Sequence, residues 1–169
     1  MIEEEIERKL LPTSWLDVAQ ALNLEVPTSY IQQAYIVREP TVSVRIRTHD
    51  FFNGGGLKAI VCIKRSIGDD TLIRNEEQFE MDYDMADTIL SALPDDQVIR
   101  KNRHCVQGYD VDEFGGALQG LVLVEREFDT AEEARSFILP DWVAEDVTND
   151  PDYINSNLIG RRYHNGTLI

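Results

Sequence analysis

Strict alternation of apolar and polar residues is the strongest pattern in this sequence. Between residues 41 and 48 the two sets of positions are Val42, Val44 and Ile46 against Ser43, Arg45 and Arg47. Because successive side chains of a strand point to opposite faces, this pattern predicts a strand with one apolar and one charged face. Related patterns predict further strands over residues 5–9, 30–37, 57–65, 72–81, 98–106, 109–114 and 121–128.

Short connections join several of these predicted strands. Asn53-Gly54-Gly55-Gly56 supplies residues that tolerate positive φ, and Gln107-Gly108 leaves room only for a tight turn. Both predict hairpins, which join antiparallel strands. The glycines do not indicate a phosphate-binding loop, because neither a Gly-Lys-Ser/Thr sequence nor a predicted helix follows them.

Helix-start signals appear at a few places between the predicted strands. Ser14 with Asp17 three residues later predicts a helix through about residue 24, with these core positions: Trp15, Leu16, Ala19 and Leu22. Further helices are predicted over 82–93, over 130–139 from Thr130 and Glu133, and over 152–158 after Asp150-Pro151. We expect one domain over residues 1–159 and a polar tail over 160–169.

Composition limits the possible functions. The chain has 169 residues and a formal net charge of −15, which argues against nucleic acid and anionic membranes as partners. No run of about 18 apolar residues predicts a membrane span, and no secretory pattern opens the chain. Two cysteines, Cys62 and Cys105, are typical of a reduced protein rather than a disulfide framework. We therefore expect a cytoplasmic protein, monomeric or homodimeric, that acts on a small molecule.

Charged residues share one face within each predicted strand. They are Glu5, Glu7 and Lys9; Arg45 and Arg47; Lys64; Arg74 and Glu76; Lys101 and Arg103; Asp112; and Glu125 and Glu127. Closing an antiparallel sheet into a barrel removes its edges, and would then turn these faces inward. Burying a charge without a partner costs on the order of several kcal/mol of folding free energy. Such an interior must be wet, internally paired, or occupied by metal ions and a polyanion.

Glu5-Ile6-Glu7-Arg8-Lys9 opens this pattern. In a strand its three alternate charged side chains lie on one face. Two carboxylates can hold a divalent cation, since hard cations prefer oxygen ligands, and a nearby lysine can neutralise a phosphate oxygen. An ordinary strand with its charged face in solvent could have the same sequence, so the interpretation depends on the rest of the chain.

The order of the motifs resembles that of the CYTH superfamily, the triphosphate tunnel metalloenzymes. Glu5-x-Glu7-x-Lys9 is similar to the first family motif, and further similarities follow in order along nearly the whole chain. They lie at Tyr30–Ile36, Val44-Arg45-Ile46-Arg47, Ala59–Lys64, Arg74-Asn75-Glu76, Lys101-Asn102-Arg103, Asp112-Glu113-Phe114, Gly120–Phe128, Asp146-Val147-Thr148 and Tyr153-Ile154-Asn155.

The resemblance implies an α+β fold, in which an eight-stranded antiparallel closed β-barrel forms a tunnel with helices packed outside. It implies hydrolysis of a linear triphosphate, most simply tripolyphosphate to pyrophosphate and phosphate, with one or two Mg²⁺ or Mn²⁺ ions. The implied catalytic residues are Glu5, Glu7, Lys9, Glu125 and Glu127. The implied metal ligands are Glu5, Glu7, Glu76, Asp112, Glu125 and Glu127, and the alternative role of Asp112 is to position a water molecule. The implied phosphate-binding residues are Lys9, Arg45, Arg47, Lys64, Arg74, Lys101 and Arg103.

Two departures from the family pattern bear on these expectations. Gln78 stands where the family often has glutamate, and Cys62 where threonine is usual. Either could alter the metal stoichiometry or the substrate preference. The resemblance leaves as alternatives an adenylyl cyclase or a nucleoside or thiamine triphosphatase, because the family includes these activities, and Gln78 adds a non-catalytic polyphosphate-binding module.

Overall fold

The computed structural model describes the backbone of residues 3–67 and 70–169, and the side chains of residues 5–66 and 75–169. Its strands are β1 (Glu3–Pro12), β2 (Ser29–Glu39), β3 (Val42–Phe51), β4 (Gly56–Ile67), β5 (Asp70–Met81), β6 (Ile99–Val106), β7 (Tyr109–Phe114), β8 (Val122–Glu127), β9 (Val143–Asp146), β10 (Tyr163–His164) and β11 (Thr167–Leu168). Its α-helices are α1 (Trp15–Leu22), α2 (Tyr83–Ala92) and α3 (Ala131–Ser136). Short 3₁₀ turns are η1 (Asp95–Gln97), η2 (Gly116–Leu118), η3 (Pro151–Tyr153) and η4 (Asn155–Leu158).

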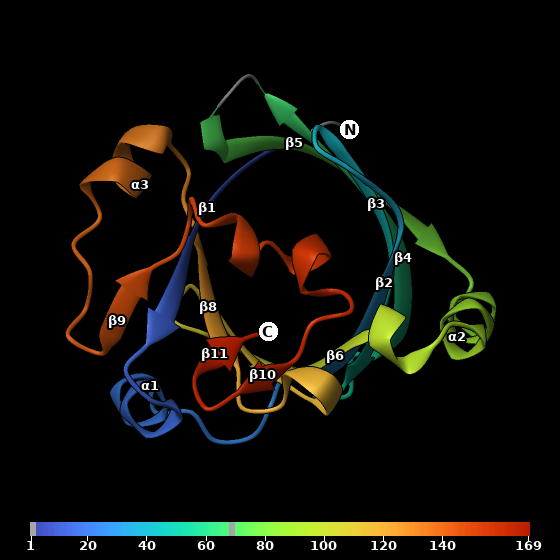
Figure 1. The fold of residues 1–169 in the computed structure, drawn as a ribbon, viewed down its shortest axis with the longest axis horizontal. Coiled ribbons are helices and arrows are strands. Elements are labelled where there is room, and N and C mark those ends of the chain that lie inside the picture. The colour runs from blue at the N-terminus through green and yellow to red at the C-terminus, as the bar shows by residue number, and fades with distance from the viewer. Residues whose placement is uncertain (1–2, 68–69) are drawn as a thin grey trace.

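One strongly curved antiparallel sheet organises the molecule (Figure 1). Its nine strands follow the order β5-β4-β3-β2-β6-β7-β8-β1-β9, and β5 pairs additionally with the start of β1. The prediction of an eight-stranded closed barrel is wrong, because the sheet has nine strands and is not closed into a barrel. Within the described part of the chain, β5 meets β1 only between Ile73–Glu76 and Glu3–Ile6, and β9 pairs with the last residues of β1. The physical reason is that β1 divides its pairing among β5, β8 and β9, so none of them follows it along its whole length.

The inward face of the sheet changes character along each strand. On β8 it runs from Leu123 to Glu125, and on β6 from Ile99 to Lys101. The apolar ends belong to one buried cluster: Ile99, Phe114, Leu118, Leu121, Leu123, Val147, Leu158 and Ile159. The C-terminal residues Leu158 and Ile159 therefore fill one end of the interior with apolar side chains, and the other end remains charged.

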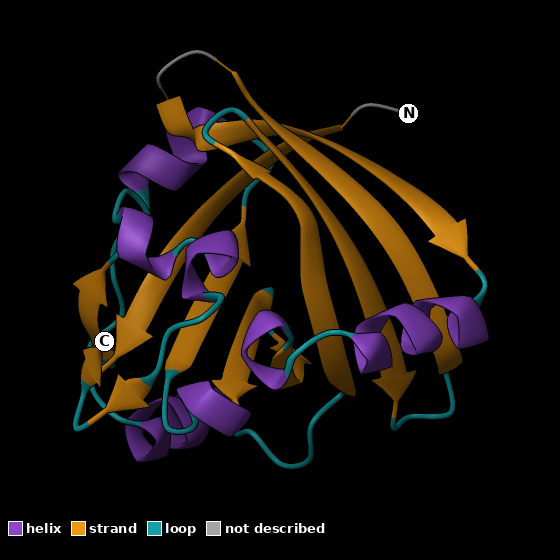
Figure 2. Cartoon of the chain, turned by 45° about the vertical axis from the view of Figure 1, so that its right-hand side comes forward, coloured by secondary structure: helices purple, strands orange, loops and turns teal. Residues whose placement is uncertain are grey.

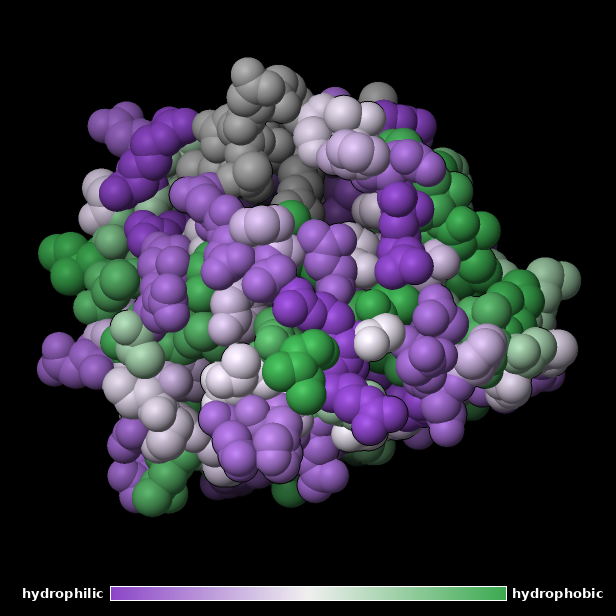
Figure 3. Space-filling view, viewed as in Figure 1, coloured by the Kyte–Doolittle hydropathy of each residue, from purple (hydrophilic) through white to green (hydrophobic). Residues whose placement is uncertain are grey.

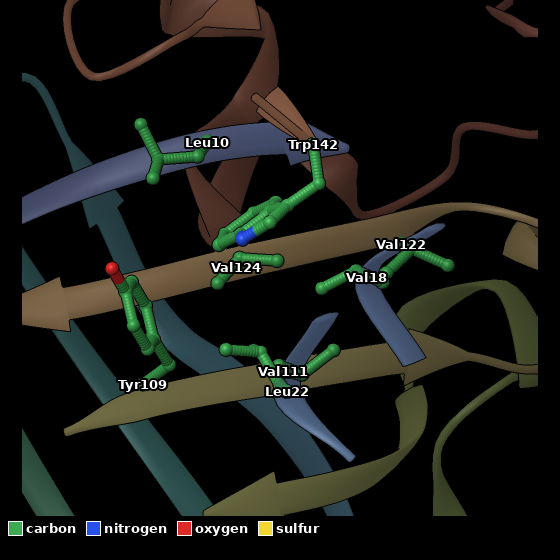
Figure 4. Close-up of a cluster of buried hydrophobic side chains, with 8 residues drawn as sticks. All are labelled: Leu10, Val18, Leu22, Tyr109, Val111, Val122, Val124 and Trp142. Atoms are coloured by element: carbon green, nitrogen blue, oxygen red, sulfur yellow. The ribbon is translucent and has the colours of Figure 1, made fainter. Parts of the chain in front are cut away.

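A second apolar core lies on the outer side of β1, β7 and β8. Figure 4 shows its members, which are Leu10, Val18, Leu22, Tyr109, Val111, Val122, Val124 and Trp142. The rings of Tyr109 and Trp142 meet edge to face with centroids 5.6 Å apart. This arrangement confirms that the apolar positions of the strands face outward beneath a helix, which leaves the charged positions inside.

The helices begin where the sequence predicts. Ser14 accepts a hydrogen bond from the Asp17 backbone, and Thr130 accepts one from Glu133, as expected of N-caps. α2 packs outside β2, β3 and β4, with Ala86 against Ile46 and Ala59, and Figure 2 shows it crossing these strands. The predicted inner face of α1 is only partly right. Leu22 is buried, but Leu16 is 61% exposed and Val18 takes the core position.

The largest differences from the predicted elements lie in the C-terminal third. β9 was not predicted, and the helix expected over 152–158 is two 3₁₀ turns separated at Ile154. Residues 160–169, expected to be a polar tail, contain the β10–β11 hairpin, whose Tyr163 and Leu168 pack against the interior apolar cluster.

The surface is mostly hydrophilic on the face shown in Figure 3, as the net charge of −15 leads one to expect. Among the described residues, no helix has both the length and the apolar character needed to cross a bilayer.

Candidate active site

The charged end of the interior is a cavity of about 260 Å³, here called the central cavity. Most of the predicted site residues line it: Glu5, Glu7, Lys9, Arg45, Arg47, Lys64, Glu76, Arg103, Glu125 and Glu127. Lys101 and Asp112 do not line it but lie buried in the wall. The Arg74 side chain lies outside the described residues, although its backbone pairs with Glu5.

Strand register brings residues from distant parts of the sequence together. Glu7 lies directly opposite Glu127, and Lys9 lies opposite Glu125, in the β1–β8 pairing. Lys64 lies opposite Glu76 in the β4–β5 pairing. These pairs share the inward face because each partner occupies an inward position of its own strand.

Lys64 joins two carboxylates of the central cavity. Its Nζ lies 2.5 Å from Glu5 Oε1 and 2.8 Å from Glu76 Oε2. Burial raises the pKa of Glu5 to about 7, although Lys64 opposes this rise. Burial acts on Glu76 in the same direction, but Lys64 and Arg45 outweigh it and lower the pKa of that carboxyl to about 2. Lys64 thus pairs with both carboxylates, but burial and the neighbouring carboxylates Glu7 and Glu76 leave Glu5 the more readily protonated of the two.

Gln78 supports this arrangement from the next inward position of β5. Its Nε2 donates a hydrogen bond to Glu76 Oε1. A glutamate at this position would place a second negative charge beside Glu76, whereas the amide stabilises the ionised carboxylate. The departure from the family pattern thus has a local physical explanation.

Arg103 connects the second group of charges. It contacts Asp112 at 2.7 Å and Glu125 at 2.9 Å, and Glu125 also lies 3.1 Å from Lys9 Nζ. Burial opposes ionisation of Glu125, but Lys9, Lys101 and Arg103 hold the pKa of this carboxyl well below its usual range. Glu125 is therefore ionised and paired on both oxygens.

The ion pair between Lys101 and Asp112 is fully buried behind the cavity wall. Replacing Asp112 with asparagine should lower the free energy of unfolding by about 3–5 kcal/mol, because it leaves Lys101 without its charge partner in the interior. The double variant Asp112→Asn with Lys101→Met should recover much of this loss. Urea denaturation of the wild type, both single variants and the double variant measures the coupling, and strictly additive losses would contradict it.

Arg45 and Arg47 form the cationic side of the cavity. Both are buried. Arg47 donates from Nε to Gln33 Oε1 at 2.9 Å, whereas Arg45 Nε has no hydrogen-bond partner among the described residues. Burial, together with the neighbouring charges of Arg45 and Arg103, lowers the pKa of Arg47 to about 10. A bound polyanion would relieve this mutual repulsion.

Comparison with known proteins identifies the family. An inorganic triphosphatase of Acetivibrio thermocellus is 34% identical over 166 residues, covering 96% of this chain and 97% of that protein. An inorganic triphosphatase of Nitrosomonas europaea is 30% identical over 159 residues, covering 91% and 95%. The chain belongs to the inorganic triphosphatases of the CYTH superfamily. The resemblance seen in the order of the motifs is thereby confirmed.

Solved structures share the fold of this inorganic triphosphatase family member. A crystal structure of an inorganic triphosphatase superposes with a TM-score of 0.60 at 24% identity, covering 92% of this chain and 94% of that one. A hypothetical protein of Pyrococcus furiosus superposes with a TM-score of 0.52 at 22% identity, covering 78% and 83%. No family model matches the sequence.

Two carboxylates of this triphosphatase are placed so that they could hold a divalent cation together. Among the described residues, no three His, Cys, Asp or Glu side chains gather closely enough to hold a metal by themselves. Glu5, Glu76, Asp112 and Glu125 are engaged by cations. Glu7 lies 3.7 Å from Lys9 Nζ and directly opposite Glu127 across the strands. Partial burial and then the charge of Glu7 raise the pKa of Glu127. A Mg²⁺ or Mn²⁺ ion commonly uses one or two carboxylates, with water and substrate phosphates completing its shell, so this oxygen pair fits.

Several residues of the triphosphatase cavity were not predicted as site residues. His49, Tyr35 and Asn155 line it beside the predicted set. His49 continues the inward series Arg45, Arg47 on β3, so the alternation could have indicated it. Burial and the adjacent arginines lower the pKa of His49 to about 3, which keeps its ring neutral. Asn155 belongs to no strand, so no alternation could have indicated it.

The stability of the metal-free triphosphatase should depend on the protonation of Glu5. Because the folded-state pKa of about 7 lies above the ordinary value of 4.5, the native state keeps a proton that the unfolded state has released. This contribution is present below pH 4.5 and is lost as the pH rises to 7. Glu5→Gln should therefore gain stability relative to the wild type between pH 5 and 7.5, measured by urea denaturation at each pH. A constant difference between the two proteins would contradict the assignment.

Proposed function

We propose that this protein hydrolyses a linear inorganic triphosphate to pyrophosphate and phosphate in the central cavity, and that it uses Mg²⁺ or Mn²⁺. Membership of the inorganic triphosphatase family supports the reaction. One observation carries the proposal: the lining of the cavity is divided into a cationic part and a carboxylate part. Buried arginines form one part of it, and a facing pair of carboxylates forms another.

The cationic side chains bind and orient the phosphate chain. Arg45 and Arg47 offer planar donor groups that match phosphate oxygens, and Gln33 holds Arg47 in place. Lys9 and Arg103 are held beside Glu125, where they can approach a phosphate while remaining charged. Lys101 and Asp112 stabilise this wall from behind, because both are buried and paired. Phosphoryl transfer requires mainly such positioning and charge neutralisation.

Glu7 and Glu127 would hold the divalent cation, and Glu5 and Glu125 are the nearby carboxylates that could join them. When bound, the cation neutralises phosphate charge and acidifies a water molecule. Glu5 is suited to such a role because burial raises its pKa, and a bound cation would favour its ionised form.

A substrate panel tests the proposed function. Phosphate release from tripolyphosphate, ATP and thiamine triphosphate is measured with Mg²⁺, with Mn²⁺ and with a chelator. We expect the highest kcat/KM with tripolyphosphate and no turnover with the chelator. Preference for ATP or thiamine triphosphate would indicate another triphosphatase of the same fold. Tight binding of tripolyphosphate without turnover would instead identify a binding module.

The proposed location of this activity is the cytoplasm. Cys62 and Cys105 are both free thiols, which supports a reducing compartment.

A further inference from the structure

Asn155 links the C-terminal turns to the charged cavity. η3 and η4 lie inside the curve of the sheet, shown in red in Figure 1. Asn155 is the first residue of η4 and exposes only 8% of its surface. It lines the central cavity together with its sequence neighbours Ile154 and Ser156. Leu158, at the end of the same turn, is buried in the interior apolar cluster and anchors it.

One hydrogen bond determines the orientation of the Asn155 amide. Its Nδ2 donates to Glu125 Oε1 at 3.2 Å. Because an ionised carboxylate can only accept hydrogen bonds, the NH₂ group must be the end that faces Glu125. Oδ1 is therefore the end of the amide that does not bond Glu125. It is buried and has no hydrogen-bond partner among the described residues.

An unpaired buried acceptor costs about 1–3 kcal/mol, so Oδ1 is suited to a ligand that supplies a hydrogen-bond donor. The phosphate oxygens of a triphosphate are acceptors and would be repelled. Arg45, Arg47, Lys9 and Arg103 already supply donors for them. The reactant that carries donor hydrogens is the attacking water.

We propose that Asn155 Oδ1 accepts a hydrogen bond from the attacking water and thereby directs the water oxygen toward the terminal phosphorus. This inference rests on the proposed function and adds a water-positioning residue to it. A bond forms between the water oxygen and the terminal phosphorus, and the bond from that phosphorus to the bridging oxygen breaks. The bridging oxygen keeps the electron pair and leaves with pyrophosphate. One water proton stays on the new phosphate, and the other ends on the pyrophosphate.

Asn155→Ala tests the inference in the full-length protein with tripolyphosphate. We expect kcat to fall about 10²-fold, the loss typical of one positioned hydrogen bond in a transition state. KM should change by less than about threefold, because the interaction is absent from ground-state substrate binding. The thermal shift produced by tripolyphosphate without metal should equal that of the wild type, since the anion-binding cations are untouched.

Asn157→Ala is the matched control. Asn157 belongs to the same turn and its Nδ2 donates to Pro151 O at 2.8 Å, but it is exposed and does not line the cavity. We expect it to keep the wild-type kcat. An equal loss in both variants would show that loosening of the turn is responsible, and would overturn the inference. So would an effect of Asn155→Ala confined to KM or to anion binding.

The outcome also separates this inference from the proposed function. An active wild type with unchanged kcat in Asn155→Ala overturns the role of Asn155 alone. A wild type that is inert toward tripolyphosphate with every metal overturns both.

Discussion

Replacing Glu127 with glutamine should reduce metal-dependent hydrolysis of tripolyphosphate by about 10²–10³-fold or more. Glu127 lies opposite Glu7 at the cavity, and the pair offers oxygen ligands for the cation. Losing one ligand removes several kcal/mol of charge stabilisation in the transition state, and each 1.36 kcal/mol corresponds to about tenfold in rate. Steady-state phosphate release at saturating Mg²⁺ or Mn²⁺ measures the effect.

The fold should tolerate Glu127→Gln. The side chain is exposed, and the substitution removes repulsion from Glu7, so the free energy of unfolding should change by no more than about 0.5 kcal/mol. Glu125 is a less suitable position for this test, because it is paired with both Lys9 and Arg103. Glu145→Gln provides the control, since Glu145 is an exposed glutamate of β9 outside the cavity lining. Full activity in Glu127→Gln would exclude Glu127 as a ligand.

Replacing Arg45 with methionine should weaken triphosphate binding and lower the stability of the ligand-free protein. Arg45 is buried at the cavity, and its Nε has no partner among the described residues. Removing a buried charge that contacts an anion costs about 2 kcal/mol or more of binding, which corresponds to at least about 30-fold in Kd. Arg45 also holds the buried Glu76 in its ionised form, so its loss should lower the free energy of unfolding, because removing one member of a buried charge group leaves the other uncompensated.

Two measurements check these two effects. Tripolyphosphate should raise the melting temperature of the metal-free wild type and have little effect on that of Arg45→Met. Urea denaturation without ligand should show a loss of stability, because Glu76 loses a neighbouring cation. Arg65→Met is the control, because Arg65 lies on the neighbouring strand β4 and pairs with Glu77 outside the cavity. A normal thermal shift in Arg45→Met would exclude Arg45 from the anion site.

The local patterns of the sequence predicted the strand faces well. Alternation on β3 assigned Arg45 and Arg47 to one face and Ile46 to the other, and the structure places them in the cavity and under α2 respectively. The N-caps Ser14 and Thr130 were equally clear, because a cap requires only residues three positions apart. Short elements were missed. β9 spans four residues and β10 and β11 two each, too few for an alternation to stand out.

Non-local contacts account for the other differences. The helix expected to reach residue 139 ends at Ser136, and the ring of Phe137 packs against Phe128, 5.3 Å between centroids. Leu16 is exposed because the orientation of α1 against the sheet turns Val18 and Leu22 inward. Nothing within either helix specifies these choices.

The sequence by itself determined which side chains share a face, because a strand's period of two is a property of the local backbone. It also identified the triphosphatase family through the order of its motifs. The tertiary structure alone decided which charges meet. β1 divides its pairing among three strands, Lys64 serves both Glu5 and Glu76, and Asn155 reaches Glu125 from a turn thirty residues away. These contacts depend on strand register and on the packing of the C-terminal turns, and neither is encoded in any single segment.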